Sequence, residues 1–248
     1  MASKEPVLTP AAIARLAELL TPPAETVYPE SDGEPMAETD THRDQMADSL
    51  IYPLKEHFRD RPDVYVSGNL LLYYEEDNPK ASVAPDVFVV FGIPNRLRRT
   101  YLLWQEGRAP DVIVELTSES TRQKDRNEKR LLYEELGVGE YYLFDPLREY
   151  LVPPLQGFRL ADGYYTALKP ASHAEGEWEI ASERLGLILR TDGSALRLYD
   201  PKRNEYLRTH GEEAEARRQA EARAAEAEAE LSRLRGLLSR QKPDHNGG

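Results

Sequence analysis

The chain of 248 residues contains no cysteine, which excludes disulfide bonds and thiolate metal sites. A chain without cysteine suits the reducing cytoplasm. The sequence also lacks a run of about 18 apolar residues, so no transmembrane helix is expected. Its N-terminal segment has neither the basic start nor the apolar stretch of a signal peptide. We therefore expect a cytoplasmic protein.

Positive charge is also scarce. The 44 acidic residues outnumber the 32 lysines and arginines, and the formal net charge is −12. This balance weighs against general, sequence-independent binding to nucleic acid, which needs a positive surface. It leaves room for a local basic cleft, or for a site in which metal ions offset carboxylates.

The first half of the chain predicts helices followed by short strands. Helices are expected at 9–20 and after Thr41, the second of them kinked at Pro53. Apolar runs predict strands at 63–68 and 70–76, which we expect to form a hairpin. Further strands are expected at 85–92, 101–104 and 110–117. The last of these is apolar almost throughout, so it should be buried on both faces.

The middle of the chain predicts a parallel crossover. A helix at 122–136, ending before Gly137, separates the strand at 110–117 from one at 140–146. Short β segments bounded by Gly and Pro then indicate an antiparallel extension: 149–155, 157–161, 163–168, 186–191 and 195–200. The expected fold class is therefore α/β, with a mixed (α+β) sheet.

The C-terminal segment consists almost only of helix formers. Its small and apolar residues recur at alternating spacings of 4 and 3, the a/d seam of a coiled coil: Ala220, Ala224, Ala227, Leu231, Leu234 and Leu238. The seam is short, roughly two and a half heptads. It predicts a homo-oligomer formed in part through this helix, or else a single helix that is solvated or docked.

Charged side chains stand where a core is expected. Glu115 lies inside the apolar strand at 110–117. On a helical wheel Lys129 shares a face with Leu132, Tyr133 and Leu136, and of these Leu132 and Leu136 should pack on the sheet. A buried ammonium and a buried carboxylate are each costly unless paired. An ion pair between Glu115 and Lys129 would therefore offset the cost of burying each of them.

Asp86 is the third candidate, because "APD" precedes both the strand at 85–92 and the strand at 110–117. If these strands are neighbours, Asp86 and Glu115 converge at one end of the sheet. Two carboxylates with a backbone carbonyl suit Mg²⁺ or Mn²⁺, which can activate water against a phosphodiester. Lys129 would orient the water or stabilise the transition state. A structural ion pair, with Asp86 simply starting its strand, explains the same spacing.

Four stretches share a joint pattern: Pro85-Asp86-Val87-Phe88-Val89-Val90, Val114-Glu115-x-x-Ser118-x-Ser120-Thr121-Arg122, Asp125-x-x-x-Lys129-x-x-x-Tyr133 and Gly137-Val138-x-Glu140-Tyr141-Tyr142-Leu143-x-Asp145-Pro146. This pattern resembles the Uma2 family of the PD-(D/E)xK restriction-endonuclease-like superfamily, over roughly residues 38–200. The resemblance implies a nuclease-like α/β core with N-terminal helices. It also implies that Asp86 and Glu115 are the metal-binding acids.

The superfamily's lysine normally stands two residues after the acid, where this chain has Thr117. The resemblance implies that the following helix supplies it instead, as Lys129, with Lys124 as the fallback. Asp125 is expected to hold Lys129 as an i,i+4 pair, or to be an acid favoured by the helix dipole. His42 is expected either to support the site from the second helix or to be a surface residue.

Basic side chains near the predicted site form a candidate nucleic-acid-binding rim: Arg122, Lys124, Arg126 and Arg130, with Arg96, Arg98 and Arg99. A solvated helix face and loop would look the same in the sequence. Asp111 lies too close to Glu115 along one strand for the usual spacing, so we interpret it as a strand-start residue.

The expected organisation has four parts: an N-terminal helix and loop at 1–37, a Uma2-like core with its β extension at 38–208, a C-terminal helix at 209–242 and a disordered tail at 243–248. The expected function is a Mg²⁺- or Mn²⁺-dependent endonuclease acting on DNA. One alternative is a nuclease-derived oligomeric binding protein that no longer cuts. Another is a hydrolase of RNA or nucleotides.

Overall fold

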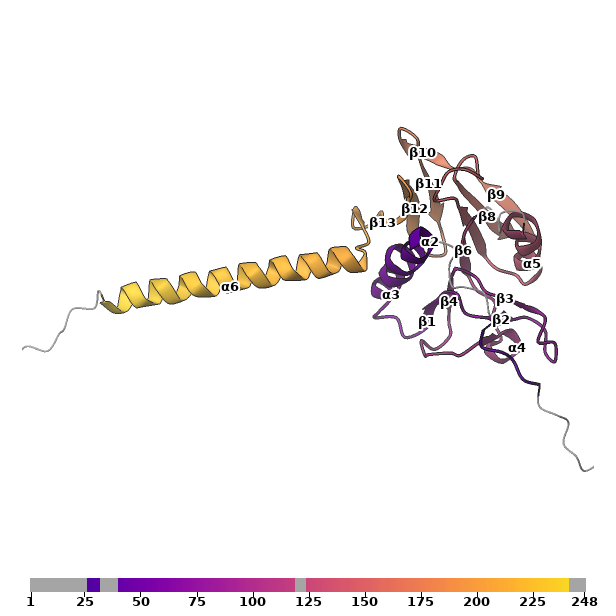
Figure 1. The fold of residues 1–248 in the computed structure, drawn as a ribbon, viewed down its shortest axis with the longest axis horizontal. Helices are drawn as coiled ribbons and strands as arrows, with labels where there is room; N and C mark the ends of the chain where they lie inside the picture. The colour runs from indigo at the N-terminus through magenta and orange to yellow at the C-terminus, as the bar shows by residue number, and fades with distance from the viewer. Residues whose placement is uncertain (1–25, 32–39, 119–123, 241–248) are drawn as a thin grey trace, which may run out of the picture.

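The described part of the chain contains three sheets, several short helices and one long helix that projects from them (Figure 1). The computed structural model describes residues 26–31, 40–118 and 124–240. The helix expected at 9–20, Arg122 and the tail expected at 243–248 lie outside these ranges. None of the helices in the described part combines the length and the apolar content needed to cross a membrane.

The largest sheet has six strands in the order β1-β4-β6-β7-β8-β9. Their bounds are β1 Val64–Ser67, β4 Val87–Phe91, β6 Val112–Leu116, β7 Glu140–Phe144, β8 Leu155–Ala161 and β9 Tyr164–Leu168. β6 and β7 are parallel, and every other neighbouring pair is antiparallel. The predicted mixed sheet is therefore confirmed.

Every residue of β6 and β7 is buried, because both faces of the sheet are covered. Alternate side chains of a strand point to opposite faces. Val112, Val114 and Leu116 join a core with the N-terminal helices and the second sheet. Ile113, Tyr141 and Leu143 join a core with Tyr133 and the third sheet.

The second sheet is antiparallel and contains β10 Ala171–Ala174, β11 Glu177–Ser182, β12 Leu187–Asp192, β13 Ala195–Asp200 and β14 Glu205–Tyr206. It contains the antiparallel extension predicted at 186–200, although the sequence pattern had missed β10 and β11. The strand expected at 149–155 was wrong except at its last residue, Leu155, which begins β8.

The third sheet overturns the predicted hairpin. It contains β2 Leu72–Tyr73, β3 Ser82–Val83 and β5 Tyr101–Leu102. β1 pairs with β4, so the strands at 63–68 and 70–76 do not pair with each other. The N–H of Asn69 donates to the carbonyl of Pro85, 2.8 Å away, and the chain then leaves the large sheet.

The N-terminal helices are α2 Asp40–Asp44, the π-helical η1 Gln45–Ile51 and α3 Tyr52–His57. Pro53 is the second residue of α3, which continues η1 without a break, since Ile51 keeps helical dihedrals (φ −65°, ψ −48°). The helix changes from π to α at Tyr52, directly before Pro53, where the sequence predicts a kink. The remaining helices are α4 Leu103–Glu106, η2 Lys124–Lys129, α5 Arg130–Glu135 and α6 His210–Arg240.

α6 begins with a capping box. The hydroxyl of Thr209 accepts from the N–H of Glu212 at 3.2 Å, and the Glu212 carboxylate accepts from the N–H of Thr209 at 2.9 Å. Asp48 of η1 accepts from the N–H of His210, which ties the start of the helix to the body. The helix then runs away from the body (Figure 1).

α5 ends in a Schellman motif centred on Gly137, which has φ +80°. The N–H of Val138 donates to the carbonyl of Tyr133 at 2.9 Å, and the N–H of Gly137 donates to Glu134 at 3.1 Å. The turn joins the helix to β7, so it also sets where the helix lies on the sheet.

Replacing Gly137 tests this turn. Gly137→Ala places a Cβ in the left-handed region, and we expect it to lower the free energy of unfolding by about 1 kcal/mol. Gly137→Asn is the matched control. Asparagine tolerates this conformation, so this variant should lose less of the free energy of unfolding. Urea unfolding measures both, and equal losses would contradict the assignment.

Candidate active site

The backbone brings Asp86 and Glu115 together. β4 and β6 are antiparallel neighbours, and Val87 lies opposite Val114, so Asp86 follows opposite Glu115. The Asp86 carboxylate Oδ2 accepts from the N–H of Leu116 at 2.7 Å. The N–H of Asp86 lies 3.4 Å from Glu115 Oε2. Both acids therefore stand at one end of the sheet and on the same face.

Lys129 and Tyr133 approach Glu115 from the helix that covers this face. Lys129 Nζ lies 3.0 Å from Glu115 Oε2, and the Tyr133 hydroxyl donates to Oε1 at 2.6 Å. Glu115 and Tyr133 are fully buried, and the Lys129 side chain is 13% exposed. Residues four apart share a helix face, so one helix surface supplies both partners.

Tyr133 is the site residue that sequence reasoning missed. The sequence pattern gives Tyr133 no separate role; in the structure its ring lies in the core, where it packs with Tyr141 at 5.1 Å between ring centroids. Its hydroxyl nevertheless needs a partner when buried. The i,i+4 spacing from Lys129 was the signal in the sequence that could have indicated Glu115 as that partner.

Burial, together with the neighbouring charge of Asp86, raises the pKa of Glu115 to about 7, against the opposing effects of Lys129 and the hydrogen bond from Tyr133. Burial and Glu115 also raise the pKa of Tyr133, so Tyr133 remains a donor at neutral pH. A cation near Glu115 would favour its charged form.

His42 supports the same end of β6. It lies in α2 and is 6% exposed, so it is not a surface histidine. Its Nε2 is 3.2 Å from the carbonyl of Thr117, two residues after Glu115. The position in which the superfamily usually has its lysine is thus a buried threonine whose N–H and hydroxyl both reach the carbonyl of Phe144.

A family model described as "Uma2: Putative restriction endonuclease" matches residues 16–192. The chain belongs to the Uma2 family. One solved structure, described as that of a "putative nuclease belonging to DUF820" from Anabaena variabilis ATCC 29413, is 15% identical with a TM-score of 0.40. The match covers 64% of this chain and 88% of that one. A search of curated proteins finds no match.

Membership of the Uma2 family makes this chain a restriction-endonuclease-like protein, so nuclease is the class of function that the family indicates. In the described part of this Uma2 protein, no three His, Cys, Asp or Glu side chains are grouped to hold a metal ion. The candidate donor set is the two carboxylates of Asp86 and Glu115, which stand on neighbouring strands at one end of the sheet. It fits Mg²⁺, which binds one or two carboxylates and keeps water and substrate phosphate as its other ligands.

The predicted basic rim is only partly placed. Lys124, Asp125 and Arg126 belong to η2, but their side chains lie outside the described part, so the pair of Asp125 with Lys129 stays a prediction. Arg130 does lie in the described part, with its guanidinium 5.5 Å from the Phe158 ring.

Arg96, Arg98 and Arg99 do not border the site. They follow the far end of β4, about 17 Å from Asp86 at the usual rise of a strand. Arg96 and Arg98 pair with Glu106, and Arg99 pairs with Glu30. Arg98 also stacks over Tyr65, at 4.1 Å from the ring centroid. These arginines therefore stabilise the loop through their ion pairs, and they lie too far away to contact a substrate bound at Asp86.

Asp111 lies at the same far end. It is 7% exposed, accepts from the N–H of Phe91 at 2.8 Å and pairs with Arg108 and Arg184. Its contacts join two strands and two arginines, which agrees with the expected role as a strand-start residue.

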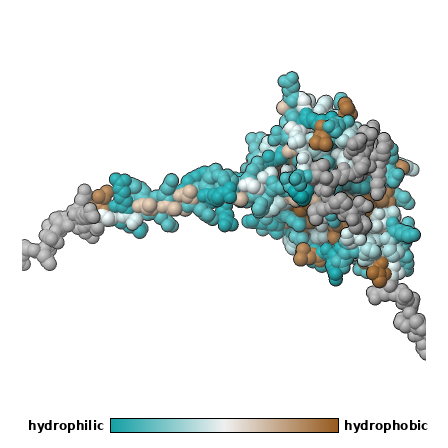
Figure 2. Space-filling view, viewed as in Figure 1, coloured by the Kyte–Doolittle hydropathy of each residue, from teal (hydrophilic) through white to brown (hydrophobic). Residues whose placement is uncertain are grey.

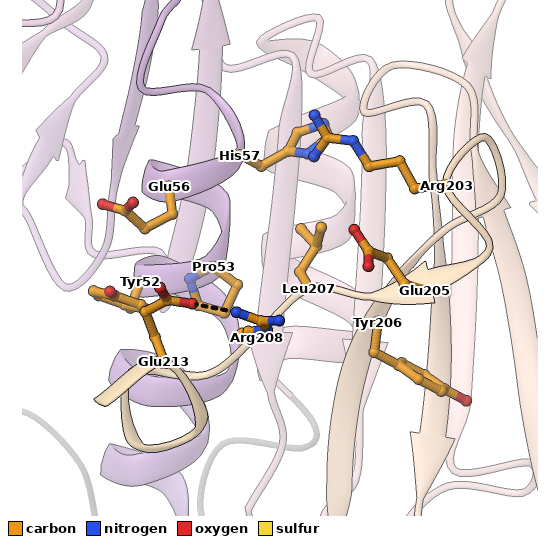
Figure 3. A pocket seen from close by; sticks show the side chains of 10 residues that line it. All are labelled: Tyr52, Pro53, Glu56, His57, Arg203, Glu205, Tyr206, Leu207, Arg208 and Glu213. Carbon is orange, nitrogen blue, oxygen red and sulfur yellow. Dashed lines mark hydrogen bonds and ion pairs between the residues drawn. The ribbon is translucent and has the colours of Figure 1, made fainter. Parts of the chain in front are cut away.

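A surface cavity of about 300 Å³ opens elsewhere, between α3, β14 and the start of α6 (Figure 3). Its charged lining is mixed: His57, Arg203 and Arg208 with Glu56, Glu205 and Glu213. Arg208 and Glu213 form an ion pair of 3.2 Å across it. None of the residues that meet at Glu115 lines this cavity, so we assign it no part in the chemistry.

Gly68 is a second residue that the sequence pattern did not mark for the site. A Cβ on Gly68 would lie 2.0 Å from the carbonyl oxygen of Asp86 and 2.7 Å from Ile51 Cδ1. Only glycine therefore lets the two backbones approach so closely. The sequence pattern places Gly68 at the end of the strand expected at 63–68, next to the turn of a hairpin that the structure does not form.

Gly68→Ala is expected to move the backbone of Asp86 and to lower the free energy of unfolding by about 1–3 kcal/mol through overpacking. Gly236→Ala in α6 is the control: apart from its own helix, no described atom lies within 4 Å of the added Cβ, and alanine favours a helix, so this variant should lose no stability. Thermal and urea unfolding measure both variants. An unchanged stability for Gly68→Ala would show that the backbones can separate without cost.

The raised pKa of Glu115 predicts a pH-dependent comparison with Glu115→Gln. The folded protein holds this proton more tightly than the unfolded chain, so wild-type stability is lost as the pH rises from 4.5 towards about 7. Glutamine has no such proton. Between pH 5 and pH 8, the free energy of unfolding of Glu115→Gln should therefore rise relative to that of the wild type by on the order of 2–3 kcal/mol. Urea unfolding with EDTA present measures the difference, and a pH-independent difference would contradict the raised pKa.

Proposed function

We propose that this Uma2 protein is a metal-dependent endonuclease that hydrolyses phosphodiester bonds, with DNA as its substrate. The observation that carries the proposal is the meeting of Asp86, Glu115 and Lys129 at one end of the sheet, with Lys129 Nζ 3.0 Å from Glu115. The family indicates a nuclease, and these side chains are the chemistry that a nuclease of this kind needs.

Asp86 and Glu115 would hold Mg²⁺ or Mn²⁺, which when bound lowers the pKa of water and neutralises charge on the phosphate. Asp86 is oriented for this by the N–H of Leu116, and Glu115 by the hydroxyl of Tyr133. Lys129 places a positive charge beside Glu115, where it would hold a water molecule or stabilise negative charge developing on the phosphate.

The proposal has further parts. The protein would act in the cytoplasm, which agrees with the absence of cysteine. It would bind nucleic acid through η2, where Lys124 and Arg126 lie, with Arg122 just before it. Its chains would associate as a homo-oligomer in part through α6.

A second candidate function is a nuclease-derived binding protein that no longer cuts. The net charge of −12 favours it, because an acidic surface repels nucleic acid. The structural ion pair between Glu115 and Lys129 would then be the reason for their burial. A hydrolase of RNA or nucleotides uses the same ion and water chemistry, so only substrate assays separate it from a DNA endonuclease.

Three substitutions test the endonuclease: Asp86→Asn, Glu115→Gln and Lys129→Met. Each removes a charge that the reaction needs, so each should lower the rate of Mg²⁺- or Mn²⁺-dependent cleavage about 100-fold or more. Plasmid DNA, single-stranded DNA and RNA are incubated with the purified full chain, and the products are quantified. Urea unfolding verifies that each variant still folds.

Matched controls lie close by. Glu128→Gln removes an exposed carboxylate next to Lys129, and Lys55→Met removes an exposed ammonium on α3, so both should cleave as the wild type does. Cleavage retained in all three site variants would refute the proposal. If the wild type cuts none of the substrates, calorimetry with Mn²⁺ distinguishes the candidates: a site lost in Asp86→Asn supports metal chemistry, and no binding supports the silent protein.

A further inference from the structure

α6 is a long helix without a described partner along most of its length. It has 31 residues, about 46 Å at the usual helical rise. All of its described side chains from Arg217 to Leu237 are exposed, with Leu231 at 53% and Leu234 at 46%. Figure 2 shows pale and brown patches on this shaft, among hydrophilic side chains. An apolar stripe of this kind is usually covered by another helix.

The stripe follows heptad positions. Ala220, Ala227 and Leu234 fall at d, and Ala224 and Leu231 fall at a. Arg217 occupies the preceding a position and pairs with Glu221 of its own helix at 3.0 Å, so the apolar seam begins at Ala220. Alanine at the start and leucine further along make the seam asymmetric from end to end.

We propose that α6 pairs with α6 of a second copy of this chain as a parallel, in-register, two-stranded coiled coil. The proposal rests on the self-association proposed above and is independent of the metal chemistry. In register, each seam residue meets its own copy. Leucine then packs on leucine and alanine on alanine, so no large side chain faces a gap.

The flanking charges favour the parallel arrangement. In a parallel pair, a residue at g meets the e residue five positions later on the partner helix. Arg223 at g would meet Glu228 of the second copy, and Glu230 at g would meet Arg235 of the second copy. Both contacts join opposite charges, and symmetry makes each of them occur twice.

The antiparallel overlap of the same seam is disfavoured, because g then meets g and e meets e. Glu228 would lie against its own copy, and so would Glu230. Like charges at these flanking positions destabilise a pair. Leu231 would also face Ala227, which leaves the leucine layer incomplete.

The contacts that anchor α6 on the body determine at which end of the coiled coil each body lies. The helix starts at His210, whose N–H is bound by Asp48, and Glu212 pairs with Arg197 of β13 at 2.8 Å. Both contacts hold the N-terminal end of α6 on the body. A parallel pair therefore carries both bodies at the same end of the coiled coil.

Sedimentation of the full chain over a range of concentrations tests the association. The average mass should rise from 28.2 kDa towards twice that value. Ala220→Lys with Ala227→Lys places lysines in the seam and should raise the Kd about 100-fold or more, because the buried ammoniums would be unpaired. Ala222→Lys with Ala229→Lys is the matched control, with the same substitutions on the outer face. A monomer at every concentration, or equal loss in both double variants, would overturn the proposal.

Orientation is tested with single cysteines, since the chain has none of its own. Ala220→Cys lies near its own copy only in the parallel register, so mild oxidation should convert most of this variant to a covalent dimer. Ala222→Cys on the outer face should cross-link at least about tenfold more slowly. A dimer in which Ala220→Cys cross-links no faster than Ala222→Cys refutes the parallel pairing while leaving self-association intact.

Discussion

The burial of the Glu115 carboxylate is the constraint on which the rest of the site depends. A carboxylate with no exposed surface must be neutralised or hydrogen-bonded, and both of its oxygens have partners here. Lys129 and Tyr133 supply these partners from one face of one helix. The helix is therefore held on the sheet by a polar contact as well as by the core beneath it, and its position along β6 is set by that contact.

Each end of the β6–β7 pair buries a glutamate carboxyl group, and the two ends stabilise it differently. At the far end Glu140 is also fully buried, but it is surrounded by Arg159, the hydroxyl of Tyr142, Ser182 and the N–H of Glu183. That arrangement is a network that ties the large sheet to β11. At the other end, Glu115 pairs with Lys129 and accepts from Tyr133, and Asp86 stands beside it on the neighbouring strand. Glu140 therefore serves to hold the sheets together, whereas Glu115 holds the helix on the sheet at the end where we propose the active site.

The protein joins two parts with different sources of stability. The body depends on long-range packing between sheets and helices, including close contacts such as that of Gly68 with Asp86. α6 depends on local features: a capping box, high helix propensity and ion pairs between residues three or four apart, such as Arg218 with Glu215. It can therefore extend from the body as a helix whose apolar stripe remains accessible.

Local patterns in the sequence determined the apolar strands, the end of α5 at Gly137 and the inward direction of Lys129, because each depends on residues a few positions apart. Together with the resemblance to Uma2 proteins, they selected Asp86, Glu115 and Lys129 as candidate site residues, and the structure brings Lys129 to Glu115. Tertiary structure alone decided that β1 pairs with β4 instead of with its neighbour in the chain, that Arg98 lies far from Asp86 and that Tyr133 donates to Glu115. Strand pairing and buried contacts join residues distant in the sequence, and their energies depend on what surrounds them, which no short window of residues contains.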